Sequence, residues 1–223
     1  MFESAAHNHL AWNCLVGGSS LGDTPQTLGM GCILDGRHVL TAQHLWLNNR
    51  HRYTWPAVVI DDDIFPCEVA FEESSSDIMV LRTIRKPFSS PQYCEPQYPN
   101  FSERQAVPGI SVGLIARLLT SSEDSSETIL LRHFVSGTVA TVLPERASGV
   151  PRFAISGVCL QRGSCGTAVF ASDGSILGVL VKTLWFPADL DATHGIWYAL
   201  HIVSSIFPLI QDINPLITHS NHS

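Results

Sequence analysis

The chain has 223 residues, of which 45% are hydrophobic and 15% are charged, which is enough apolar content for one large folded domain or two small ones. Thirteen Lys and Arg stand against twenty Asp and Glu, so the formal net charge is −7 and we expect no nucleic-acid partner. No apolar run approaches the roughly 20 residues of a membrane helix, so we expect no membrane partner. The longest apolar run, Ile176 to Val181, suits a buried strand.

The N-terminus lacks a basic region followed by an apolar core, so we expect no secretory signal and a cytoplasmic protein. The six cysteines are scattered without a Cys-x-x-Cys pair, which favours free thiols over a disulfide scaffold. Neither Cys nor His pairs at the spacing of zinc ligands. We therefore expect no metal and no cofactor.

Short apolar or β-branched runs recur along the chain, and their length favours strands over helices. Asp35-Gly36 separates two such runs and is a tight hairpin signal. Prolines gather between Pro87 and Pro108, which indicates a linker between two β-rich halves. Only the stretch 199–212 has apolar spacing that fits a helix, which Pro208 should shorten or kink. The predicted strands include, in chain order, Gly31–Leu34, Ala57–Ile60, Ile78–Leu81, Ile110–Leu119, Ile129–Val142, Phe153–Val158, Thr167–Ala171 and Ile176–Leu184.

Three stretches carry side chains suited to acyl transfer. Thr41-Ala42-Gln43-His44 ends a strand pattern on a histidine, Asp77 precedes the apolar run that begins at Ile78, and Gly163-Ser164-Cys165-Gly166 sets a thiol between glycines. An imidazole can take the proton of a thiol, and a carboxylate can hold the ring in the correct tautomer. The chain order of histidine, acid and nucleophile predicts a catalytic triad of His44, Asp77 and Cys165.

The nucleophile has two candidates. With Cys165 as nucleophile, Gly163 stands two residues before it and Gly166 directly after it, which suits a loop whose backbone N–H groups point at an oxyanion. With Ser164 as nucleophile, Arg162 and Cys165 would occupy those positions. The spacing favours Cys165, and Ser164 stays the alternative. The oxyanion hole is expected at Gly163 and Cys165, with the N–H of Ser164 as a lesser donor.

The three stretches resemble the signature stretches of chymotrypsin-like peptidases, with a cysteine where most members have serine, as in the viral chymotrypsin-like cysteine proteases. The resemblance implies an all-β fold of two six-stranded antiparallel β-barrels, with a cleft between them and a C-terminal α-helix. It divides the chain into a first barrel with His and Asp (1–90), a linker (91–108), a second barrel with the nucleophile (109–198), a helix (199–214) and a tail (215–223).

The same resemblance implies where substrate binds. Two residues shortly before the nucleophile would help form the pocket for the residue preceding the scissile bond, and a glycine would leave room at the opposite wall. No acid occupies the position at the pocket base, so we expect a neutral or apolar residue there rather than Lys or Arg. Asp189 and Asp191 would favour a basic residue only if they turned inward. The substrate-binding residues implied are Cys159, Leu160, Val181, Lys182, Thr183 and Gly195, with the substrate added as a strand along 181–184.

We therefore predict a cysteine endopeptidase that cleaves protein or peptide substrates through a thioester acyl-enzyme. Two alternatives stay open: a non-catalytic peptide-binding module on the same fold, and a serine peptidase that acts through Ser164. An enzyme whose cleft is closed without a regulatory protein partner would resemble the binding module when tested alone.

Overall fold

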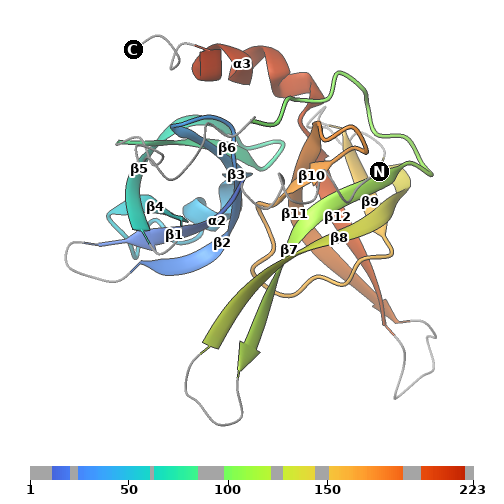
Figure 1. Ribbon diagram of the computed structural model, residues 1–223, viewed down its shortest axis with the longest axis horizontal. Helices are drawn as coiled ribbons and strands as arrows, with labels where there is room; N and C mark the ends of the chain where they lie inside the picture. Colours follow the sequence, from blue (N-terminus) through green and yellow to red (C-terminus); the bar gives the residue numbers. More distant parts are fainter. Residues whose placement is uncertain are drawn as a thin grey trace.

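The computed structural model describes residues 12–20, 25–60, 63–84, 98–121, 128–143, 151–187 and 197–218. In these ranges the chain forms two closed antiparallel barrels of six strands each. Figure 1 shows the barrels side by side, with the C-terminal helix lying across their common end. The predicted fold class is confirmed.

The first barrel uses the N-terminal strands in the order β1-β2-β3-β6-β5-β4. The hairpin predicted at Asp35-Gly36 joins the second strand to the third, and the N–H of Leu34 donates to the carbonyl of His38 across it at 2.8 Å. A short helix follows the third strand. The elements are β1 (Asn13–Ser19), β2 (Gln26–Ile33), β3 (His38–Ala42), α2 (Gln43–Leu47), β4 (Trp55–Ile60), β5 (Asp63–Glu73) and β6 (Ile78–Thr83).

The second barrel follows in the order β10-β11-β12-β9-β8-β7. Figure 1 shows the β7–β8 and β11–β12 pairs extending well beyond the barrel wall as two-stranded ribbons. No helix in the described ranges has the length and apolar character to cross a bilayer. The elements are β7 (Ser111–Ser121), β8 (Thr128–Leu143), β9 (Arg152–Ser156), β10 (Ala168–Phe170), β11 (Ile176–Pro187), β12 (Trp197–Ser205), the 3₁₀ turn η1 (Phe207–Leu209) and α3 (Ile210–Thr218).

The apolar side chains form three clusters, one inside each barrel and one between the barrels. Side chains alternate across a strand, so a strand at the junction buries one face in its own barrel and the other against the neighbour. Val39 packs inside the first barrel while Leu40 faces the junction, and Val169 packs inside the second barrel while Phe170 faces the junction. Burial on both faces explains why these strands appear in the sequence as unbroken apolar runs.

The apolar cluster between the barrels, here called the junction cluster, contains side chains from both barrels and from the C-terminal segment. Its aromatic centre is Trp12 beside Phe170, with ring centroids 6.0 Å apart. The buried members are Trp12, Cys32, Leu34, Leu40, Ala42, Leu45, Ile78, Val80, Ala154, Ala168, Phe170, Ile176, Val179, Val181, Ile202, Ile206, Leu209 and Ile213.

The predicted terminal helix at 199–214 is wrong over its first half. Residues 199–205 belong to β12, which pairs with β11 on one side and with β9 on the other. Hydrogen bonding to two neighbouring strands, with apolar packing on both faces, outweighs the helical spacing of the apolar residues. The second barrel therefore extends to Ser205 rather than 198. Pro208 lies in η1, and α3 (Ile210–Thr218) runs on into the predicted tail.

Removing the aromatic side chain at the centre of the junction cluster should destabilise the protein strongly. Phe170 is fully buried, so we expect Phe170→Ala to lower the free energy of unfolding by about 3 to 5 kcal/mol in urea titrations. Phe207→Ala is the matched control, because that side chain is 37% exposed and its loss should cost under about 1 kcal/mol. Equal effects of the two substitutions would contradict this account of the junction.

Candidate active site

His44 lies in α2, two residues beyond the end of β3, rather than at the end of the strand itself. β3 pairs with β6 so that Ala42 stands opposite Ile78. This register brings the start of α2 against Asp77, and the N–H of Gln43 donates to the carbonyl of Asp77 at 3.0 Å. The strand pairing of the first barrel thus brings together two residues that are far apart in the sequence.

Asp77 holds His44 through both carboxylate oxygens. Oδ1 accepts the backbone N–H of His44 at 2.7 Å, and Oδ2 lies 2.7 Å from His44 Nδ1. An ionised carboxylate only accepts, so the proton of this contact belongs to Nδ1. The other ring nitrogen, Nε2, is left for a group on the far side. The two side chains are 31% and 23% exposed, so the pair lies near the surface but is largely shielded from water.

The loop that carries Cys165 reaches this pair from the second barrel. It lies between β9 and β10 and turns at Gly163 and Gly166, whose φ angles of 89° and 91° suit glycine. The carbonyl of Cys165 accepts the N–H of Met30 in the first barrel at 2.8 Å. A Cβ on Gly166 would overlap the carbonyl oxygen of Met30. The loop therefore docks directly on β2, and glycine is required at the contact.

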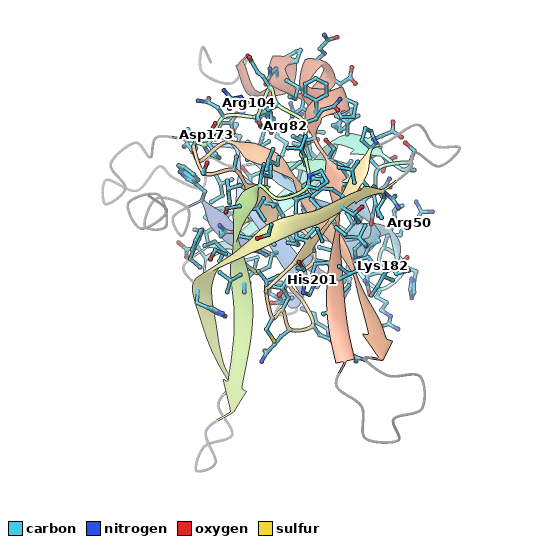
Figure 2. All side chains as sticks on the ribbon, turned by 90° about the vertical axis from the view of Figure 1, so that its right-hand side faces the viewer. Arg50, Arg82, Arg104, Asp173, Lys182 and His201 are labelled. Carbon is cyan, nitrogen blue, oxygen red and sulfur yellow. The ribbon has the colours of Figure 1, made fainter. Side chains whose placement is uncertain are left out.

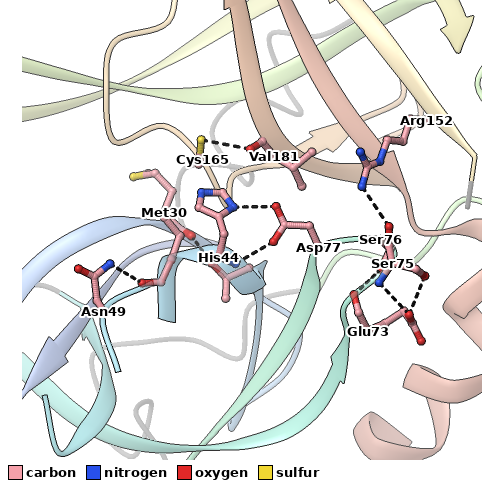
Figure 3. A network of polar contacts seen from close by, with 12 residues as sticks. Met30, His44, Asn49, Glu73, Ser75, Ser76, Asp77, Arg152, Cys165 and Val181 are labelled. Carbon is pink, nitrogen blue, oxygen red and sulfur yellow. Dashed lines mark hydrogen bonds and ion pairs between the residues drawn. The ribbon is translucent and has the colours of Figure 1, made fainter. Parts of the chain in front are cut away.

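Figure 3 shows the sulfur of Cys165 on the opposite side of the His44 ring from Asp77. Hydrogen bonds to Asp77 first, and to Cys165 second, raise the pKa of His44 to about 9. The thiol also lies 3.7 Å from the carbonyl oxygen of Val181, to which it can donate. The structure thus brings the three predicted triad residues together.

Because the pKa of His44 is raised on folding, the stabilising effect of its protonated ring is complete below pH 6.5 and is lost as the pH rises through about 9.

The backbone N–H groups near the sulfur differ in their partners. The N–H of Ser164 donates to the carbonyl of Gln161 at 3.3 Å, whereas those of Gly163 and Cys165 donate to no group in the part of the chain that the structure describes. The hydroxyl of Ser164 is buried and has no partner among the described residues. Gly163 and Cys165 therefore offer the two free backbone donors of this loop, and the Ser164 hydroxyl forms no hydrogen bond to His44.

The predicted substrate-binding residues lie on two segments of the second barrel. Cys159 is exposed and Leu160 is buried in the loop after β9, and Lys182 is exposed on β11. The register of β11 against β12 shifts between Leu180 and Lys182, so Val181 between them has no partner in the ladder. Gly195 lies outside the described residues. Figure 2 shows Lys182 beside His201, where the β11–β12 ribbon leaves the barrel.

His201 links the two segments and was not found from the sequence. Its Nδ1 lies 2.9 Å from Thr183 Oγ1, and its Nε2 lies 3.2 Å from the carbonyl oxygen of Val158. A carbonyl only accepts, so Nε2 carries a proton; desolvation lowers the pKa of His201, so the ring is neutral at neutral pH and Thr183 donates to Nδ1. Sequence spacing missed this residue because it lies in the stretch that was predicted to be helical.

One edge of β11 is open beside the site. β10 pairs with β11 only as far as Val179, and β12 pairs with the residues beyond on the other edge. Among the described strands, none pairs with the first edge over 182–184. A strand edge with free N–H and carbonyl groups can accept an added strand.

A cavity of about 540 Å³ lies elsewhere, between the segment 102–111 and the turn after β10. Arg104 and Asp173 line it, and Figure 2 shows both at the end of the second barrel away from His201. It contains none of the predicted site residues and so is separate from the candidate active site.

Removing the charge of Asp77 should change the titration of His44. In Asp77→Asn we expect the pKa of His44 to fall from about 9 toward that of an ordinary histidine, because its strongest stabilising contact is lost. NMR titration of the imidazole nitrogens measures this directly. His201 is the internal control, with its pKa below the ordinary value in both proteins. An unchanged His44 pKa in Asp77→Asn would contradict the coupling.

No protein-family model matches the sequence, and no curated protein matches it. Solved structures do match. The mouse serine protease neuropsin aligns with a TM-score of 0.64 at 11% identity, covering 94% of this chain and 95% of its own. The active form of the Rv3671c protease from M. tuberculosis aligns at 0.55 and 14%, covering 92% and 82%. The MamO protease domain from Magnetospirillum magneticum aligns at 0.54 and 16%, covering 92% and 97%. At these identities the likeness shows the fold alone, which is the chymotrypsin-like fold.

Proposed function

We propose that the chain is a cysteine endopeptidase whose catalytic residues are Cys165, His44 and Asp77. The observation that carries this proposal is the placement of His44, which contacts the carboxylate of Asp77 through Nδ1 and the thiol of Cys165 on its other side. The neighbours of known structure support it, since each of them is described as a protease.

In the proposed reaction, the sulfur of Cys165 attacks the carbonyl carbon of the scissile peptide bond after giving its proton to His44. The oxygen that becomes negative is stabilised by the N–H groups of Gly163 and Cys165, which are free to donate. The C–N bond breaks as His44 gives its proton to the leaving amine. Water, deprotonated by His44, then attacks the thioester, releasing the acid and regenerating the thiol. Asp77 keeps the ring oriented and stabilises its charged form.

Two observations favour Cys165 over Ser164 as the nucleophile. The hydroxyl of Ser164 is buried and has no hydrogen-bond partner among the described residues, whereas the sulfur of Cys165 lies beside the His44 ring on the side away from Asp77. Both glycines of the turn have positive φ, and they stand two residues before Cys165 and directly after it, the spacing that suits an oxyanion loop around Cys165. These contacts also disfavour a purely peptide-binding module, because such a module has no need of a hydrogen-bonded thiol and imidazole.

For the substrate we propose an extended peptide added to the open edge of β11 along 181–184. The side chain preceding the scissile bond would lie near Cys159, Leu160 and Thr183, with Gly195 at the opposite wall. Leu160 and Thr183 carry no charge, and desolvation lowers the pKa of His201, which keeps its ring uncharged at neutral pH. A neutral residue is therefore favoured over Lys or Arg at this position.

Removing the sulfur should abolish peptide cleavage. We expect Cys165→Ala to lose all measurable turnover and Ser164→Ala to keep most of it, because alanine retains the backbone N–H. Iodoacetamide should label Cys165 before the exposed Cys159, since only Cys165 has an imidazole partner. Loss of activity in Ser164→Ala with retention in Cys165→Ala would establish the serine mechanism instead. Saturable peptide binding without turnover in the native protein would establish the binding module.

Cleavage of a denatured proteome should reveal a neutral residue before the scissile bond. The native enzyme and Cys165→Ala are incubated side by side, and the new N-termini found only with the native enzyme are sequenced by mass spectrometry. Enrichment of Lys or Arg before the cleaved bond would contradict the proposed pocket and would point to the acids of the 188–196 segment.

A further inference from the structure

The turn that presents Asp77 has an unfavourable backbone conformation. Asp77 has a φ of 59°, the only positive φ of a non-glycine residue in the described part of the chain. A residue with a Cβ adopts this left-handed conformation at a cost, so its surroundings must impose it. The carboxylate that orients His44 therefore depends on whatever holds the residues before it.

Contacts within the first barrel hold one side of this turn. The N–H and hydroxyl of Ser75 both donate to Glu73 Oε1, at 3.0 and 2.6 Å, and these bonds lower the pKa of the Glu73 carboxyl. The hydroxyl of Ser76 donates to the carbonyl of Glu73 at 3.0 Å. The side-chain amide of Gln43 donates to Ser74 Oγ at 3.1 Å. All of these partners belong to the same barrel as Asp77.

The other side of the turn is held from the second barrel. Arg152 begins β9, and its Nη2 donates to the carbonyl of Ser75 at 3.0 Å across 77 residues of sequence. Figure 3 shows the guanidinium extending to the turn beside Asp77. Its Nε is buried without a partner, and Arg152 forms no ion pair with the residues that the structure describes. The guanidinium of Arg152 therefore hydrogen-bonds to the backbone carbonyl of Ser75, two residues before Asp77.

We infer that Arg152 is a positioning residue, which fixes the Asp77 turn from the second barrel and so couples docking of the barrels to the orientation of His44. The inference rests on the proposed function for its kinetic consequence only. A hydrogen bond from a charged donor is stronger than one between neutral groups, so it can favour one conformation of a strained turn. The barrel that carries the nucleophile would then also complete the partner of its general base.

The test compares three substitutions. Arg152→Met keeps the aliphatic stem and removes the donors, Arg152→Lys keeps one charged donor, and Arg82→Met is the control. Arg82 pairs with Glu68 on the exposed face of β6, where it contacts neither the turn nor the site. We expect Arg152→Met to lower kcat about 10-fold with KM within about twofold, Arg152→Lys to restore much of the loss, and Arg82→Met to have no effect.

A second measurement does not depend on catalysis. In the Cys165→Ala background, NMR titration should give a lower His44 pKa in Arg152→Met than in the parent, and an unchanged one in Arg82→Met. Asp77→Asn should remove this difference, because Arg152 is inferred to act through Asp77. The group that faces His44 in this background is Asp77, since Cys165 has been replaced.

The outcomes separate the two claims. If the His44 pKa and kcat stay within error in Arg152→Met while only the urea midpoint falls, Arg152 is merely structural and the inference is overturned. If Arg152→Met does not fold, Arg152→Gln, which removes the charge and shortens the side chain, is titrated in its place, and a smaller fall in the His44 pKa is expected. If the titration behaves as expected but no peptidase activity exists, the coupling stands and the proposed function fails.

Discussion

The approach of Cys165 to His44 depends on the docking of one loop of the second barrel on β2 of the first. The hydrogen bond from Met30 N–H to the carbonyl of Cys165, at 2.8 Å, fixes the peptide that carries the sulfur. The approach is so close that neither side tolerates a side chain at the contact, since a Cβ on Gly29 or Gly166 would overlap its neighbours. Thr41 reinforces the contact, because its hydroxyl also donates to the carbonyl of Met30 at 2.7 Å. The thiol of Cys165 and the ring of His44 belong to different barrels, so the distance between them is fixed only when the barrels are held together at a close contact such as this one.

Burial of apolar side chains provides most of the free energy that holds the barrels together, and hydrogen bonds determine their relative position. The junction cluster is non-directional and holds the barrels together, but it does not by itself set a sulfur beside a ring nitrogen. The hydrogen bonds of Cys165, Thr41 and Arg152 cross or border the junction and select one relative placement. The relative orientation of the two barrels is thus set by a few hydrogen bonds, while the large apolar contact keeps the barrels together.

Local chemistry explains how much could be read from the sequence. The strand-rich halves were predictable because unbroken apolar runs are local signals, whereas the two barrels were implied by the family resemblance of three short motifs. Those motifs contain His44, Asp77 and Cys165, which the structure places beside one another. β5 was harder, since its exposed face carries Glu68 and Glu72 and its run is broken by Pro66. His201 and Arg152 gave no signal, because their roles depend on partners 18 and 77 residues away. The terminal helix was misplaced because residues 199–205 pair with two neighbouring strands, and the spacing of apolar residues in the sequence cannot reveal that pairing.

The division of the candidate site between two barrels, with His44 and Asp77 on one and Cys165 on the other, has a consequence for the covalent link between them. Because the junction cluster joins the halves by side-chain packing, the covalent link between β6 and β7 adds to their association by raising their effective concentration. A nick there would then leave the barrels associated. Two fragments made by dividing the chain between β6 and β7 would reassemble the site when mixed. The first fragment alone would contain His44 and Asp77, and the second alone would contain Cys165.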